Sequence, residues 1–213
     1  MLTLRTRKTR AAKVTAALRE AFPESGCSLH HQDAWQLLVA TILSAQCTDA
    51  RVNKVTPDLF LAFPTVTDFA EASQESIEEA IRSTGFFRNK AKSLKGAAQA
   101  IIEEHGGEVP DSLDAMVKLP GVGRKTANVV LGEIWNKPGG VVVDTHVSRI
   151  AFKLGLTDTK DAVKAERQLN EVLPRSDWRD FTHLIIDHGR LTCRARAPRC
   201  DECPLYRWCE TRS

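Results

Sequence analysis

Apolar residues recur at helical spacing along most of this chain. Behind Asp33, a polar residue suited to capping a helix, apolar side chains follow an i, i+3, i+4, i+7, i+8 pattern at Trp35, Leu38, Val39, Ile42 and Leu43. A second helical face consists of Phe87, Ala91, Leu94, Ala98 and Ile101, and the Gly106–Gly107 pair ends it. Only Val141 to Val143 resembles a strand, and this run is too short and isolated for a sheet. The pattern predicts an all-α protein.

Composition narrows the class of protein without identifying it. The chain has 213 residues, a hydrophobic fraction of 42% and a net charge of +3, so it suits one large domain or two small lobes. It has no apolar run of about 18 residues, which excludes an ordinary transmembrane helix. The N-terminus is rich in arginine, as a transit peptide is, but Ser is absent, and Val14, Leu18 and Phe22 continue at helical spacing. We therefore expect a folded helix with a basic start.

A tight glycine turn, LPGVG at 119–123, follows a short helix that begins at Asp111 or Ser112 and precedes a longer helix pattern. Gly121 and Gly123 can adopt positive φ and allow close backbone approach. Unpaired amides and the helix dipole make such a turn an anion site. The glycines are too close together for a nucleotide-triphosphate loop, which needs four residues between them. A phosphate of a polymer is the better candidate.

Lys125 opens the helix after this turn, and Asp144 ends the apolar run further on. Arg124 and Lys125 could both be solvated phosphate contacts. Alternatively, Lys125 faces a pocket, where a neutral amine can act as a nucleophile. Asp144 is the natural second member of such a site, although it is also suited to cap a helix that starts near Thr145. One carboxylate can do both.

Four of the six cysteines crowd the C-terminal stretch with the spacing C-x6-C-x2-C-x5-C, at Cys193, Cys200, Cys203 and Cys209. This concentration favours one metal site in a reducing compartment over a disulfide scaffold. A zinc ribbon usually has two CxxC pairs, and this loop has one. The spacing therefore favours an iron–sulfur cluster, with zinc as the alternative. His188 and Arg190 are expected to pack near this loop.

Two further polar segments stand at helix ends. Gln46 lies in LSAQCTD at 43–49, which is either a helix end with a cap at Thr48 or Asp49, or a functional loop. Phe86 lies in the loop before the second helix and is either a core residue or an exposed wedge for base pairs. Arg88 and Lys90 are expected to contact phosphates.

LPGVGRKTANVV at 119–130, VDTH at 143–146 and the cysteine spacing together resemble the endonuclease III family of helix-hairpin-helix DNA glycosylases. The resemblance extends from about Val14 to Cys209. It implies that Lys125 is the attacking amine and Asp144 the essential carboxylate. It also implies a 4Fe–4S cluster on the four C-terminal cysteines.

The same resemblance assigns DNA contacts. Gln46 would fill the space left by an extruded nucleotide, and Phe86 would be the wedge, although Phe-Phe at 86–87 differs from the Leu-Tyr pair typical of the family. From the residues themselves, the remaining expected contacts are with the DNA backbone, at Gly121, Gly123, Arg124, His146, Arg190 and Arg194. His146 could instead position Asp144 or be a hydrogen-bonded structural residue.

The implied activity is that of a bifunctional glycosylase and AP lyase of base excision repair. It would remove oxidised pyrimidines through a lysine Schiff base and cut the strand 3′ to the abasic site by β-elimination. Double-stranded DNA with damaged bases or abasic sites would be its partner. We expect a monomer without membrane contact, in the cytoplasm at the nucleoid of a bacterial or archaeal cell.

The expected architecture is all-α and two-lobed, with the active site in the groove between the lobes. Residues 23–135 would form a helical bundle that carries the hairpin, and residues 1–22 plus 136–213 would form a second helical domain with the cysteine loop. The loop NKPGG at 136–140 is slightly longer than is typical of the family, which could reshape the pocket.

Two other functions stay open. A monofunctional, adenine-removing relative would lack the lysine and carry a Glu on an early helix, whereas the segment 33–46 has no Glu and Lys125 is present. A non-catalytic DNA-binding module would use the hairpin alone. The combination of Lys125 with Asp144 argues against it.

Overall fold

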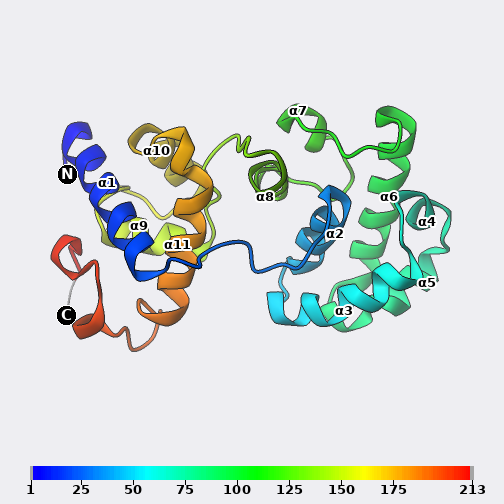
Figure 1. Ribbon diagram of the computed structural model, residues 1–213, viewed down its shortest axis with the longest axis horizontal. Coiled ribbons are helices and arrows are strands. Elements are labelled where there is room, and N and C mark those ends of the chain that lie inside the picture. The colour runs from blue at the N-terminus through cyan, green and yellow to red at the C-terminus, as the bar shows by residue number, and fades with distance from the viewer. Residues whose placement is uncertain (1, 212–213) are drawn as a thin grey trace. The chain divides into compact units, whose positions relative to one another are not determined.

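The structure is a computed structural model that describes residues 2–211. Within that range it consists of α-helices and short 3-10 helices joined by loops, and it contains no strand (Figure 1). The valine run at 141–143 is irregular. Val141 is buried, and its amide donates to Asn170 Oδ1 at 2.8 Å. The predicted all-α class is confirmed.

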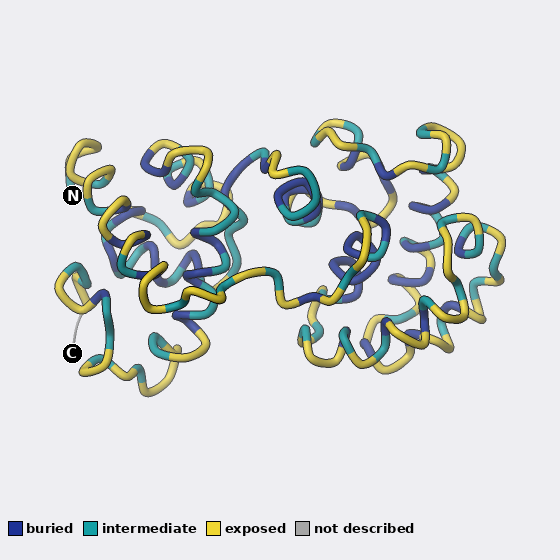
Figure 2. The backbone as a smooth tube through the Cα atoms, viewed as in Figure 1, coloured by how far each residue is buried: buried dark blue, intermediate teal, exposed yellow. Residues whose placement is uncertain are grey.

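The apolar periodicity of the sequence becomes a repeating change between buried and exposed residues along the helices, so that one face of a helix is buried (Figure 2). α2 (Ala34–Ser44) is the most buried of the helices that the sequence predicted, and its buried residues run without a break from Leu37 to Leu43. As expected, Asp33 caps it, accepting from the Gln36 amide at 2.8 Å. α6 (Phe87–His105) buries one face, and Gly106 ends it, as predicted. Gly106 has a left-handed backbone.

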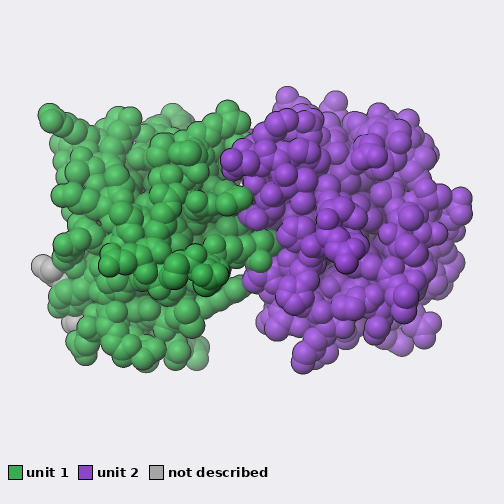
Figure 3. Space-filling view, in the orientation of Figure 1, with its two compact units in different colours: residues 1–27, 138–213 green, residues 28–137 purple. Residues whose placement is uncertain are grey.

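The chain divides into two compact units, residues 1–27 with 138–213 and residues 28–137 (Figure 3). We describe each by itself. The domains expected from the sequence, 23–135 and 1–22 plus 136–213, stay a prediction, because a division by packing does not show which segments fold independently.

The unit of residues 28–137 contains the hairpin. Its helices, in chain order, are α2, α3 (Asp49–Ala62), α4 (Val66–Glu71), α5 (Gln74–Ala80), η1 (Arg82–Thr84), α6, α7 (Leu113–Met116) and α8 (Arg124–Trp135). α2 packs on α3, α6 and α8, and α4 packs on α6. Trp35 and Phe69 meet edge to face with ring centroids 5.2 Å apart, inside this core. α2, which is largely buried, and the longer α6, which buries one face, thereby support the hairpin and the loops that follow α2 and precede α6.

The other unit combines the N-terminal helix with the C-terminal segments. Its helices are α1 (Leu4–Ala21), α9 (Thr145–Lys153), α10 (Ala162–Val172), η2 (Arg175–Asp177), α11 (Trp178–Leu191), η3 (Cys200–Glu202) and η4 (Tyr206–Trp208). Val14 and Leu18 of α1 enter a core with Ile150, Phe181 and Ile185, which confirms the expected N-terminal helix. Between residues 2 and 211, no helix combines the length and apolar character needed to cross a membrane.

Candidate functional site

The hairpin consists of α7, the turn at 119–123 and α8. The side chains of Leu119 and Val122 are buried and anchor the turn in the core. The Val122 amide donates to Leu119 O at 3.1 Å. Gly121 has a φ of +75°, and a Cβ there would lie 2.4 Å from Ser93 Cβ of α6. Both facts require glycine at this position. Gly123 has a φ of −85° and open space around it, so the expected positive φ is wrong for Gly123.

Gly123 is the N-cap of α8, and no side chain caps this helix. The first amides of a helix lack partners within the helix, and the dipole adds positive potential there. The exposed turn therefore presents backbone donors to an anion, as the sequence predicted for a phosphate. Arg124 and Lys125 are exposed on the first turn of α8. The catalytic assignment of Lys125 stays a prediction.

Asp144 caps α9 in the other unit, as expected. Its Oδ1 accepts from the Val147 amide at 2.8 Å, and the residue is half-buried. One carboxylate oxygen is thus used for the cap, and the second has no part in it. The pairing of Asp144 with Lys125 in one site stays a prediction.

His146 lies on the first turn of α9, half-buried, with its Nδ1 3.3 Å from an Arg149 guanidinium nitrogen. Burial lowers the pKa of His146; Asp144 opposes this shift, while Arg149 and Arg190 add to it. α11 approaches closely at Gly189, where a Cβ would lie 2.3 Å from His146 Nδ1. His146 is therefore held in place by its surroundings, and its expected backbone contact with DNA stays a prediction.

Gln46 and Phe86 are both exposed, and both have a left-handed backbone, with φ of 53° and 48°. Phe86 is 64% exposed, so the alternative that it belongs to the core is wrong. Gln46 follows the end of α2, and Thr48 caps α3 by accepting from the Arg51 amide at 3.3 Å. Two polar or aromatic side chains are thus presented to solvent by strained backbone, a combination that is frequent at functional sites.

The expectation for Lys90 needs correction. Its side chain is only 5% exposed, and its ammonium donates to Leu43 O at 2.8 Å and Thr84 O at 2.9 Å. An ammonium held inside the protein by two carbonyls cannot reach a phosphate. Arg88, two residues earlier, is exposed, with its guanidinium 5.7 Å from the Phe87 ring centre, and it remains available for that role.

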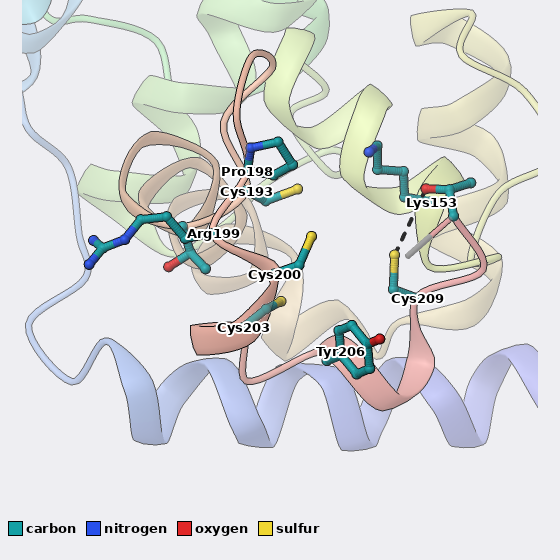
Figure 4. Close-up of a pocket in the computed structure, with 10 residues that line it drawn as sticks. Lys153, Cys193, Pro198, Arg199, Cys200, Cys203, Tyr206 and Cys209 are labelled. Atoms are coloured by element: carbon teal, nitrogen blue, oxygen red, sulfur yellow. Dashed lines mark hydrogen bonds between the residues drawn. The ribbon is translucent and has the colours of Figure 1, made fainter. Parts of the chain in front are cut away.

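The four C-terminal cysteines line one pocket together with Lys153, Arg199 and Tyr206, and their sulfur atoms face its interior (Figure 4). All four are half-buried, and burial raises the pKa of the Cys203 thiol. Among residues 2–211, no three His, Cys, Asp or Glu side chains gather closely enough to hold a single metal ion. The cysteines thus share a pocket without closing around one point. Arg190 and Arg194 are exposed close to this loop in sequence, and their DNA contacts stay predictions.

Comparison with known proteins shows the family and the fold of this chain. The family described as HhH-GPD superfamily base excision DNA repair protein matches residues 39–175. The endonuclease III of Synechocystis sp. is 51% identical over 203 residues, which cover 95% of this chain and 93% of that relative. The chain belongs to the endonuclease III family.

Solved structures of the family agree with the fold. A non-covalent endonuclease III–DNA complex and a trapped endonuclease III–DNA covalent intermediate, the latter an estranged-adenine complex, each give a TM-score of 0.90 at 39% identity. Each match covers 99% of this chain, with 96% and 97% of the respective structures. The resemblance inferred from the hairpin and the cysteine spacing is confirmed.

Two residues support the cysteine pocket: Arg149, which sequence reasoning missed, and His188, which it expected near this loop. Arg149 donates to the Cys193 carbonyl at 2.8 Å and lies 3.6 Å from its sulfur. His188 is buried, with Nε2 3.7 Å from Cys203 Sγ, and burial together with Arg149 lowers the pKa of His188 to about 4. Arg149 and Cys193 are 44 residues apart, and no local pattern marks such a pair. The expected packing of His188 near the cysteine loop is confirmed.

Proposed function

We propose that the chain is a bifunctional DNA glycosylase and AP lyase of base excision repair, with oxidised pyrimidines in duplex DNA as its substrates. The observation that carries this is Lys125, exposed on the first turn of α8 directly behind the phosphate-binding turn. Support comes from the relatives named endonuclease III and from the structure of such a protein trapped covalently on DNA. Only an amine nucleophile gives both base displacement and an iminium.

The chemistry starts with extrusion of the damaged nucleotide, because C1′ of its sugar is hidden in the duplex. Neutral Nζ of Lys125 bonds to C1′ as the glycosidic bond breaks, and the electron pair leaves with the base, which takes up a proton. Asp144 stabilises the positive charge that develops on the sugar and assists proton transfer. The C1′–O4′ bond of this adduct then breaks, O4′ takes up a proton, and the nitrogen lone pair forms the C1′=N double bond of the Schiff base. The Schiff base acidifies the C2′ proton, whose loss expels the 3′ phosphate and cuts the strand.

DNA binding would involve three groups of residues. The hairpin turn with Gly121, Gly123 and Arg124 grips a backbone phosphate through amides and charge. Gln46 fills the vacated stack with an amide that offers donor and acceptor, and Phe86 wedges between bases. The outer backbone contacts are assigned to Arg88, His146, Arg190 and Arg194.

We also propose that Cys193, Cys200, Cys203 and Cys209 hold a 4Fe–4S cluster. The pocket fits this group because four thiols face one space, whereas zinc would need them around a single point. The bound cluster would supply structural cross-linking of the loop, and base excision requires no electron transfer from it. Iron and acid-labile sulfide, measured on protein purified without oxygen, should approach four of each per chain. Zinc in their place would contradict the assignment.

Borohydride trapping tests the catalytic proposal. The substrate is a duplex with one oxidised pyrimidine, offered to the parent chain, to Lys125→Ala and to Lys164→Ala, which removes an exposed lysine on α10. We expect the parent and Lys164→Ala to cross-link to DNA and Lys125→Ala not to. A parent that removes the base without trapping would be monofunctional, with Asp144 acting through water.

A parent that binds the duplex and does neither would be a binding module or would prefer another lesion. A duplex with an abasic site, tested in parallel, separates these outcomes. An AP lyase forms the trapped species there whatever base it prefers, whereas a binding module does not.

A further inference from the structure

Lys90 is a buried cation with a specific pair of partners. It lies on the first turn of α6, and its ammonium donates to Leu43 O at 2.8 Å and to Thr84 O at 2.9 Å. A buried lysine loses hydration, and it is tolerated when hydrogen bonds replace the lost water. The two carbonyls belong to segments far apart in the chain, because Leu43 is 47 residues from Lys90 whereas Thr84 is 6 residues away. The ammonium therefore joins two separate segments.

Each joined segment ends in an exposed residue with strained backbone. Leu43 lies in the last turn of α2, three residues before Gln46. Thr84 ends η1, two residues before Phe86. Gln46 and Phe86 have φ of 53° and 48°, although neither is glycine. Among non-glycine residues 2–211, only Asn136 and Ala197 share this feature.

The carbonyl of Leu43 needs a donor because it lies at the C-terminal end of a helix. The last carbonyls of a helix have no partner within the helix, and a cation near the C-terminus interacts favourably with the dipole. Lys90 supplies both a donor and the charge to Leu43 O at the end of α2. A left-handed non-glycine residue costs about 1–2 kcal/mol, and it persists only where its surroundings fix it. Fixing the carbonyls just before Gln46 and Phe86 limits the freedom of both segments.

We propose that Lys90 is a positioning residue that holds the Gln46 and Phe86 segments together for extrusion of the target nucleotide. The inference rests on the proposed function, because both residues are assigned there to the opened duplex. Lys90 does not contact DNA in this role. It sets the spacing of two residues that do, and misplacement by about 1 Å far from the reacting atoms can cost about 100-fold in rate.

Lys90→Met tests the proposal, because methionine fills similar space without a donor. Lys95→Met is the matched control on the same helix. Its ammonium also donates to one carbonyl, Ala72 O at 2.7 Å, which belongs to the end of α4 and to neither segment. Thermal unfolding of both variants separates loss of stability from loss of positioning.

The readout is the ratio of two single-turnover rates: base removal from a lesion in duplex DNA, and strand cleavage at an abasic site in single-stranded DNA. The second reaction needs no extrusion from a duplex. We expect Lys90→Met to lower this ratio about tenfold or more, and Lys95→Met to leave it unchanged. In the background Gln46→Ala/Phe86→Ala, adding Lys90→Met should lower the ratio by less than twofold, because the residues that it positions are gone.

An unchanged ratio in Lys90→Met would overturn the proposal and leave Lys90 as a purely structural residue. So would a full additional tenfold loss in the Gln46→Ala/Phe86→Ala background. If Lys90→Met does not fold, Lys90→Gln replaces it: the shorter, uncharged amide should not hold both carbonyls, so the ratio should again fall, and an unchanged ratio would overturn the proposal. Absence of both reactions in the parent chain would refute the proposed function itself, an outcome distinct from parent activity with an unchanged ratio.

Discussion

Asp144 shows at the scale of one residue how a structural and a chemical role can share a side chain. Its Oδ1 accepts from the Val147 amide and starts α9. The cap requires an oxygen acceptor, while stabilisation of a cationic sugar requires a negative charge. The two requirements can therefore be separated by substitution.

We expect Asp144→Asn to retain the cap and lose the chemistry. Asparagine caps about as well as aspartate, so the free energy of unfolding should fall by about 0.5 kcal/mol, the contribution of charge to the helix dipole. Asp144→Ala loses the acceptor as well and should cost about 1 kcal/mol more. Urea unfolding measures stability, and borohydride trapping measures activity. Full trapping by Asp144→Asn would show that the charge is not required.

The environment of His146 predicts how stability depends on pH. Burial holds the pKa of His146 below its ordinary value. The charges of Arg149 and Arg190 lower this pKa further, and the charge of Asp144 raises it in part. Between the folded pKa and about 6.5, the unfolded chain binds more protons at this site. Stability should therefore fall as the pH decreases through this window, and the His146 contribution should be constant above it.

Comparison of His146→Asn with the parent isolates this slope in urea unfolding at pH values on both sides of 6.5. Removal of the negative charge in Asp144→Asn should lower the pKa of His146 further, which proton NMR of the imidazole can follow. A rise of that pKa in Asp144→Asn would show that Asp144 does not act on the ring as a charge.

Single-residue features were predictable where they depend on local chemistry. Asp33 and Asp144 carry the short acceptors that caps require, and both caps are present. The burial of Lys90 was not predictable, because it depends on carbonyls supplied by Leu43 and Thr84. The same applies to the left-handed backbone of Phe86, a residue type that rarely adopts it.

At the scale of elements, the helices that the sequence defined best are those with a periodic apolar face and a polar cap. α2 has both, with Asp33 as its cap, whereas α6 has the apolar face and ends at Gly106 but begins after Phe86 without a side-chain cap. The short α7 lacked such a pattern, and its cap at Ser112 was one of two candidates. The turn after α7 was recognised by its two glycines. The sequence did not show that only Gly121 is packed against α6, at Ser93, because α6 lies outside the hairpin motif.

Gly121→Ala should damage the hairpin, and Gly123→Ala is its matched control. Alanine at 121 must adopt a φ of +75° with its Cβ 2.4 Å from Ser93 Cβ, whereas at 123 the φ is −85° and the space is open. We expect Gly121→Ala to lose about 2–4 kcal/mol, the sum of left-handed strain and overpacking. Gly123→Ala should lose about 1 kcal/mol at most, because glycine is a better N-cap than alanine. Urea unfolding measures both, and equal losses would show that α6 yields to the added methyl group.

On the scale of the whole molecule, the cysteine pocket is connected to the core of one compact unit. Cys193, Cys203 and Trp208 pack against the cluster of buried residues that contains Val14, Ile150 and Phe181. Arg149 ties Cys193 to α9. A metal that fixes the loop would thus stabilise the unit formed by residues 1–27 and 138–213.

Removal of the proposed cluster should therefore loosen the two units unequally. We expect amide hydrogens of α9 and α11, and of the loop from Cys193 to Cys209, to exchange faster in cluster-free protein. Amides of α2 and α6, which pack within residues 28–137, should keep their protection. Hydrogen exchange of holoprotein and of protein stripped by oxidation and chelation measures this, with Cys200→Ser as a second route to the cluster-free state. Equal loss in both units would show that they unfold together. Unchanged exchange throughout would show that the loop is stable without metal.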